Sequence, residues 1–161
     1  MYISIDIGGT NMRVALVDLS NSARIAKLET RPVPKKFGEG IDDLSGLIRD
    51  LSSGRTLQGI GACFPGIIDE NGMITTANNL PDWVNKPIKS TLQERFEVPI
   101  KLVHDAQGAA IGEALYGAAK NCDRFVYFIW GTGIGAGDIK KIDDQRYFMF
   151  SFENTTFSAF R

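Results

Sequence analysis

The stretch that decides the fold is Asp6-Ile7-Gly8-Gly9-Thr10-Asn11-Met12-Arg13, which lies between apolar β runs at residues 2–6 and 13–18. We expect a β-hairpin that turns at Gly8-Gly9. Glycines after a strand let backbone N–H groups approach phosphate oxygens closely. A second apolar run is followed by another such stretch, Gly131-Thr132-Gly133-Ile134-Gly135-Ala136-Gly137. Two turns of this kind predict the two halves of a nucleotide cleft.

Composition excludes several classes of protein. The 161 residues are 43% hydrophobic and 23% charged, and the net charge is −1. These values are typical of a globular protein and give no reason to expect nucleic acid or an anionic membrane as a partner. The sequence has neither an apolar run of about 18 residues nor a secretory signal, so we expect a cytoplasmic protein. Cys63 and Cys122 lack CxxC spacing, which favours reduced thiols over a disulfide or a metal site.

Hydrophobic periodicity predicts an α/β fold, because runs with strand character alternate with runs of helical spacing. The expected strands are residues 2–6, 13–18, 23–31, 57–64, 99–103 and 125–130, and the expected helices are about 40–52, 88–96 and 106–119. Residues 69–83 are expected to form a polar loop with a turn at Asn71-Gly72. Residues 136–150 are expected to form a hairpin that turns at Asp143-Asp144. We place the domain boundary near residues 121–124, which gives domains of residues 1–121 and 122–161.

The first turn carries chemistry of its own. The carboxylate of Asp6 suits Mg²⁺ held mainly through water. Gly8 and Gly9 would present N–H groups to phosphate, and Thr10 adds a hydroxyl donor. The alternative is a tight hairpin in which glycine supplies a positive φ and aspartate supplies the turn chemistry. On these residues alone, the hairpin is the favoured interpretation.

Five segments in order resemble the ROK family of sugar kinases and repressors, which belongs to the actin-like ATPase superfamily. They are residues 6–13, 64–69 (FPGIID), 79–83 (NLPDW), 104–110 (HDAQGAA) and 131–137. The resemblance implies an actin-like, ribonuclease H-like N-terminal domain with a mixed five-stranded sheet, followed by the opening β-hairpin of a second domain. It also implies ATP-dependent phosphorylation of a hexose or N-acetylhexosamine hydroxyl, as in a glucokinase, with ATP and Mg²⁺ as cofactors.

The resemblance also implies roles on the sugar side. Asp105 would be the base that accepts the sugar hydroxyl proton as that oxygen attacks the γ-phosphoryl group. Its alternative role is to cap the helix expected at residues 106–119. Gly66, Asn79, His104 and Asp105 would contact the sugar, although the family usually has Asn where His104 stands. Their alternatives are a Pro-Gly turn at Gly66, turn chemistry at Asn79 and a structural role for His104.

On the ATP side, the resemblance implies phosphate contacts from both glycine turns, with Mg²⁺ near Asp6 and bound through water. The residues concerned are Gly8, Gly9, Thr10, Gly131, Thr132 and Gly133. Arg13 could reach a phosphate, but a salt bridge at the strand edge is equally well supported. Trp83 is expected to pack the loop rather than stack on a sugar.

Residues 148–161 depart from the family pattern. In the family, a Gly-Glu-x-Gly-His stretch, a cysteine-rich zinc loop and an adenosine-binding domain follow, so we expect no zinc site in this chain. Phe148, Phe150 and Phe152 could form a strand against residues 125–130, but a truncated or frame-shifted C-terminus is preferred. We therefore expect little or no kinase activity from this chain alone.

The sequence allows two alternatives to a kinase. One is a non-catalytic sugar-binding or interaction module, and the other is the repressor branch, which would carry an N-terminal helix-turn-helix. The sequence starts at the first strand with no basic recognition helix, so a repressor is not favoured. The small-molecule partners expected are a sugar and ATP, and a homodimer is allowed.

Overall fold

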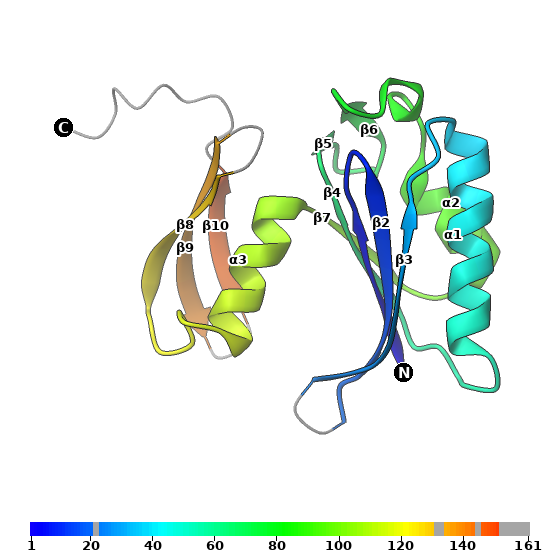
Figure 1. Cartoon of the computed structure of the whole chain (residues 1–161). Coiled ribbons are helices and arrows are strands. Elements are labelled where there is room, and N and C mark those ends of the chain that lie inside the picture. Colours follow the sequence, from blue (N-terminus) through cyan, green and yellow to red (C-terminus); the bar gives the residue numbers. More distant parts are fainter. Residues whose placement is uncertain (21–22, 131–133, 144–145, 152–161) are drawn as a thin grey trace. The chain divides into compact units, whose positions relative to one another are not determined.

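The structure, a computed structural model, describes residues 1–20, 23–130, 134–143 and 146–151 (Figure 1). The chain divides into two compact units, Met1–His104 and Asp105–Arg161. The division falls earlier than the domain boundary expected near residue 121. Helix α3 (Asp105–Tyr116) accounts for the difference, because it packs against strands of the second unit. In the described part of the chain, no helix combines the length and apolarity needed to cross a membrane.

The first unit is built on a mixed five-stranded sheet, as the sequence predicts. Its strands lie in the order β3-β2-β1-β4-β7. Strand β1 is antiparallel to β2 and parallel to β4, which is in turn parallel to β7. The hairpin expected across Gly8-Gly9 is confirmed, since Ile7 pairs with Met12. The bounds are β1 (Tyr2–Ile7), β2 (Asn11–Asp18), β3 (Arg24–Pro32), β4 (Ile60–Phe64) and β7 (Ile100–His104).

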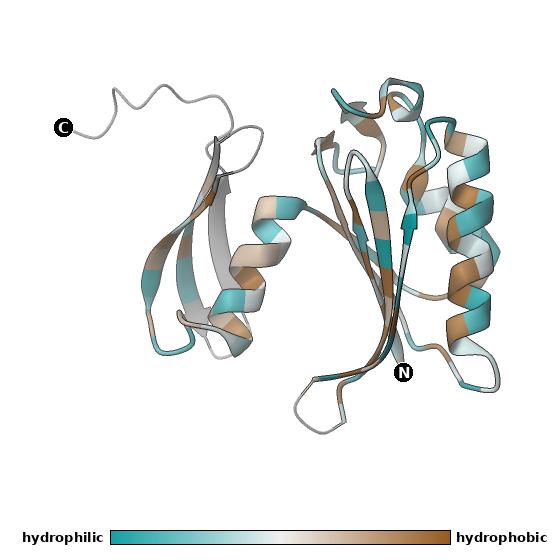
Figure 2. Cartoon of the chain, viewed as in Figure 1, coloured by the Kyte–Doolittle hydropathy of each residue, from teal (hydrophilic) through white to brown (hydrophobic). Residues whose placement is uncertain are grey.

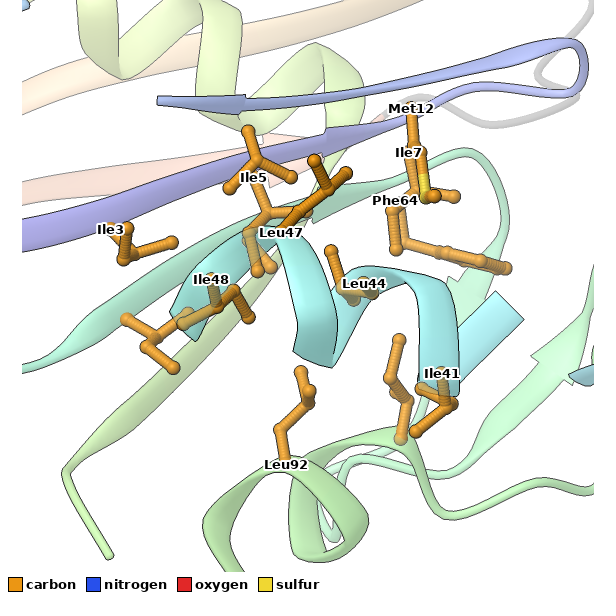
Figure 3. Close-up of a cluster of buried hydrophobic side chains, with 14 of the residues drawn as sticks. Ile3, Ile5, Ile7, Met12, Ile41, Leu44, Leu47, Ile48, Phe64 and Leu92 are labelled. Carbon is orange, nitrogen blue, oxygen red and sulfur yellow. The ribbon is translucent and has the colours of Figure 1, made fainter. Parts of the chain in front are cut away.

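Helices α1 (Phe37–Ser52) and α2 (Ile88–Phe96) cover one face of this sheet (Figure 1). The hydrophobic side of α1 faces the sheet in Figure 2. Alternate residues of β1 point into the same core, and Figure 3 shows Ile5 beside Leu47 of the helix. Each such fully buried aliphatic side chain contributes about 1.5–3 kcal/mol of burial free energy. The core therefore fixes α1 and α2 on the sheet.

Helix α1 begins at Phe37, earlier than the expected start near Gly40. The carboxylate of Asp82 accepts a hydrogen bond from the Phe37 N–H at 2.9 Å. This contact caps the helix from a distant segment, so local sequence does not reveal it. At the other end, Gly54 adopts φ +71°, as expected of a residue that ends a helix.

The segment expected to be a loop, residues 69–83, contains short regular elements. Strand β5 (Ile67–Ile68) pairs with β6 (Ile74–Thr76), and a 3₁₀ helix, η1, spans Pro81–Trp83. The turn predicted at Asn71-Gly72 is present, because Gly72 adopts φ +81° and donates to the Asp69 carbonyl at 3.0 Å. The expectation of an irregular loop is therefore wrong for β6 and η1.

The second unit consists of α3 and the antiparallel sheet β10-β9-β8. Ala106, Ala110 and Ala114 form the buried stripe of α3, which packs against β8 and β9. The expected hairpin is present, and Phe148 and Phe150 lie in a strand of the sheet that contains residues 125–130. Those two residues pair with β9, which precedes them directly and separates them from β8. The bounds are β8 (Arg124–Trp130), β9 (Ile134–Asp143) and β10 (Arg146–Ser151), and the predicted positions Asp144 and Phe152 lie outside the described residues.

Candidate functional site

The carboxyl ends of three parallel strands meet at one edge of the first sheet. Asp6 pairs with Cys63, and Phe64 pairs with His104. Gly8 therefore leaves β1, Gly66 follows β4, and His104 ends β7 at the same edge. Ligands of open α/β sheets bind outside the carboxyl ends of such strands. The edge brings together most of the site residues that the sequence predicts in the first unit.

The Gly8–Thr10 turn is held by backbone hydrogen bonds at both ends. The Gly8 N–H donates to the Asn11 carbonyl at 2.8 Å, and the Val33 N–H donates to the Thr10 carbonyl at 2.8 Å. Among the described residues, glycines with positive φ occur only at Gly54 and Gly72. The expectation that this turn needs glycine for a positive φ is therefore wrong.

Close approach explains the glycine at position 9. A Cβ on Gly9 would lie 2.7 Å from the Cβ of Asn79 and 3.0 Å from its Nδ2. Such a contact is shorter than real Cβ atoms show, so a larger residue here would push the Asn79 loop away. Asn79, predicted to contact sugar, thus packs directly on the turn predicted to contact phosphate.

Lys35 joins the same two segments. Its Nζ donates to the Gly9 carbonyl at 2.8 Å and to the Asn79 carbonyl at 3.3 Å. Nothing in the sequence signals this residue, because it is a lysine in the connection between β3 and α1. Lys35 is therefore a site residue that the sequence does not predict.

Trp83 anchors the loop that carries Asn79. Its ring is fully buried, stacks on Phe64 at 5.9 Å between centroids, and meets Phe37 edge-on at 5.3 Å. A Cβ on Gly40 would lie 2.3 Å from the indole, which explains a glycine inside α1. The expectation that Trp83 packs the loop is confirmed.

Asp6 forms an ion pair with Arg13, its partner across the β1–β2 hairpin. The Arg13 guanidinium lies 2.8 Å from Asp6 Oδ2, and both side chains are about half exposed, at 56% and 47%. The salt bridge expected at the strand edge is therefore present.

The donor set at Asp6 limits how Mg²⁺ could bind. Within the described ranges, no group of three or more His, Cys, Asp and Glu side chains could enclose a metal ion. A single carboxylate with one oxygen bound to Arg13 fits an ion that keeps its water shell and takes further ligands from phosphate. A water-mediated Mg²⁺ site at Asp6 stays a prediction.

The close approach of the Thr76 backbone explains why residue 66 is a glycine. A Cβ on this residue would lie 2.0 Å from the Thr76 carbonyl oxygen, and its N–H donates to the Phe64 carbonyl at 3.1 Å. His104, at the end of β7, is partly buried. The sugar contacts assigned to both residues stay predictions.

Asp105 belongs to the second unit, where it is the first residue of α3. Its Oδ1 accepts a hydrogen bond from the Ala106 N–H at 2.6 Å. The carboxylate therefore lies at the start of the helix, and its capping role stays a prediction. Its role as base stays a prediction.

The second unit also holds an ion pair that the motifs in the sequence do not predict. The Arg124 Nε donates to Asp138 Oδ1 at 3.0 Å, and a second guanidinium nitrogen bonds Oδ2. Only 10% of the Asp138 side chain is exposed, against 69% for Arg124. The hydrogen bond from Arg124 lowers the pKa of Asp138, and the same bond raises the pKa of Arg124. Val126 pairs with Asp138, so β-strand register could have located the pair.

The predicted phosphate residues Gly131, Thr132 and Gly133 lie outside the described residues.

Comparison with known proteins identifies the relatives of this chain. The ROK family pattern matches residues 2–142. The glucokinase of Thermotoga maritima is 36% identical over 138 residues, which cover 84% of this chain and 43% of that protein. The xylose repressor of Bacillus subtilis is 42% identical over 83 residues, covering 52% of this chain and 21% of that protein.

Solved structures of ROK family proteins are also similar to this chain. A ROK family glucokinase from Streptomyces griseus, in complex with glucose and AMPPNP, superposes with a TM-score of 0.77 at 28% identity, covering 91% of this chain and 47% of that one. The ROK hexokinase of Thermus thermophilus gives 0.76 at 28% identity, covering 85% and 46%. The chain thus spans about half the length of the glucokinases it matches. With the actin-like sugar-kinase fold and a match over residues 2–142, this chain belongs to the ROK family.

Proposed function

We propose that this chain carries the sugar-binding part and the two phosphate turns of an ATP-dependent sugar kinase of glucokinase type. The observation that carries the proposal is the contact between Gly9 and Asn79, where a Cβ on the glycine would lie 2.7 Å from the asparagine. This contact joins the turn assigned to phosphate with the loop assigned to sugar. Phosphoryl transfer depends mainly on positioning both reactants.

The proposed reaction assigns a role to each site residue. Asn79, His104 and the backbone at Gly66 bind the sugar hydroxyl groups. Asp105 accepts the proton of the attacking hydroxyl while that oxygen bonds to the γ-phosphorus and ADP leaves with the electrons of the broken P–O bond. The substrate class is a hexose or N-acetylhexosamine.

On the phosphate side, Gly8, Gly9 and Thr10 would hold ATP oxygens together with residues 131–133. Mg²⁺, when bound through water near Asp6, supplies charge neutralisation on the phosphates. Arg13 keeps the Asp6 carboxylate oriented at the strand end through its 2.8 Å bond.

The proposal also covers the kinase activity of the 161-residue chain by itself. The matched segment is 43% of the Thermotoga maritima glucokinase. Transfer needs both walls of a closing cleft, so we expect sugar binding with turnover far below the usual range of about 1–1000 per second.

The test measures binding and transfer separately on the purified chain. Calorimetry with glucose, N-acetylglucosamine and N-acetylmannosamine measures sugar affinity, and radiolabelled ATP detects weak phosphoryl transfer. Saturable sugar binding with weak transfer that requires Asp105 supports the proposal. Binding without any Asp105-dependent transfer supports a sugar-binding module instead, and no binding of any of the three sugars contradicts both. Ordinary turnover refutes the expected impairment.

A further inference from the structure

Lys35 occupies an unusual position between the two ligand-facing segments of the first unit. One ammonium group donates to two carbonyl oxygens, Gly9 at 2.8 Å and Asn79 at 3.3 Å. Charge-assisted hydrogen bonds are about twice as strong as neutral ones. Since both carbonyls bond the same Nζ, the turn and the loop are held at a fixed separation.

The residues on either side of Lys35 are anchored to the loop side of the site. The Pro34 carbonyl accepts a hydrogen bond from Trp83 Nε1 at 3.2 Å. The Phe37 N–H donates to Asp82 at 2.9 Å. These bonds fix the backbone before and after Lys35, so the side-chain entropy of the lysine is the main entropy lost when its ammonium bonds the two carbonyls.

The same segment is tied to the turn side. The Val33 N–H donates to the Thr10 carbonyl at 2.8 Å. We call residues 33–37 the strap segment. It bonds the Gly8–Thr10 turn through Val33 and the Trp83 loop through Pro34 and Phe37. Lys35 is the strap residue whose side chain reaches both.

We propose that Lys35 is a positioning residue that holds the Asn79 loop against the Gly8-Gly9 turn, so that sugar affinity depends on its ammonium group. The expected change in sugar affinity rests on the proposed function, whereas the expected change in loop position does not. Lys35 is exposed, so its loss leaves the core intact and changes global stability little. An arginine keeps the charge but replaces a point donor with a planar fork, so it restores the contact in part.

The experiment compares the wild-type chain with Lys35→Met, Lys35→Arg and Lys36→Met. Lys36 is the matched control, because it is the next residue and pairs with Glu39 at 3.4 Å instead of with the site. Amide hydrogen exchange is followed by NMR at Gly8 and Leu80, whose N–H groups bond Asn11 and Ala77 within the turn and the loop. Calorimetry with glucose and with N-acetylglucosamine measures affinity.

We expect Lys35→Met to accelerate exchange at both amides and to raise the sugar Kd about fivefold or more, with an unchanged melting temperature. Lys35→Arg should fall between, and Lys36→Met should match wild type. Unchanged exchange in Lys35→Met overturns the inference, and so does faster exchange with an unchanged sugar Kd. A wild-type chain that binds no sugar contradicts the proposed function instead, because the exchange data still decide whether Lys35 holds the loop.

Discussion

The two units of this chain obtain their geometry in different ways. In the first unit, Lys35 bonds residues that are 26 and 44 positions away, and those bonds join the proposed phosphate and sugar segments. In the second unit, Arg124 and Asp138 are 14 positions apart on neighbouring strands of a hairpin. A change at the first site therefore alters several segments at once, whereas a change at the ion pair stays local.

The largest effect is expected at Asp105, where the second unit would contribute to the reaction. We expect Asp105→Asn to reduce phosphoryl transfer about 100-fold or more, because an amide does not accept the sugar hydroxyl proton. Sugar affinity should change much less. The measurement is transfer from radiolabelled ATP to glucose.

Glu113→Gln is the control for Asp105→Asn. Glu113 lies on the same helix and bonds the Ala118 N–H at 2.8 Å, away from the start of α3. Equal transfer by Asp105→Asn and wild type would remove Asp105 from the reaction.

The packing of Trp83 on α1 is tested by two glycines of the same helix. Gly40→Ala places a methyl group 2.3 Å from the indole and should cost about 1–3 kcal/mol of unfolding free energy. Gly46 has nothing within 4 Å, so Gly46→Ala should add about 0.5–1 kcal/mol. Urea unfolding followed by circular dichroism measures both. Similar stability for the two variants would contradict the close packing.

The contact between turn and loop is tested at Gly9. We expect Gly9→Ala to weaken glucose binding about tenfold, or ~1.4 kcal/mol, because the added methyl group displaces Asn79. Gly61→Ala on strand β4 is the control, since a Cβ there meets nothing within 4 Å. Calorimetry at equal protein stability distinguishes the two, and an unaltered glucose Kd in Gly9→Ala would show that the contact does not set sugar affinity.

The sequence predicts the helices and strands better than it explains why particular residues occupy their positions. Apolar periodicity predicts the mixed sheet and locates α2 at Ile88–Phe96, because burial on one face leaves a repeat in the sequence. The start of α1 is missed, since its cap comes from Asp82, far along the chain. Gly9 and Gly66 are recognised as glycines that matter, but the atoms they approach become known only from tertiary packing.

The residues of the candidate site also differ in whether the local sequence predicts them. Residues 6–13 carry a local pattern, so the first turn and the Asp6–Arg13 pair can be anticipated. Lys35 carries no local pattern, because its contacts depend on which segments meet in space, whereas the Arg124–Asp138 pair follows from the register of β8 and β9. The sugar contacts, the Mg²⁺ site and a homodimer stay predictions.

The smallest effect is expected at Asp138, and it depends on pH. Its pKa is lowered from the usual 3.8 by the hydrogen bond from Arg124, so the folded state favours the carboxylate. This stabilisation is fully present above the unfolded pKa and is lost as the pH falls through the lower folded value. Asp138→Asn should therefore lower the urea midpoint at pH 7, and the difference from wild type should shrink below pH 4. The loss is limited because the remaining Arg124 is 69% exposed and stays solvated. Asp123→Asn, at an exposed position one residue before Arg124, is the control, and a difference that persists unchanged at low pH would exclude the ion pair as its cause.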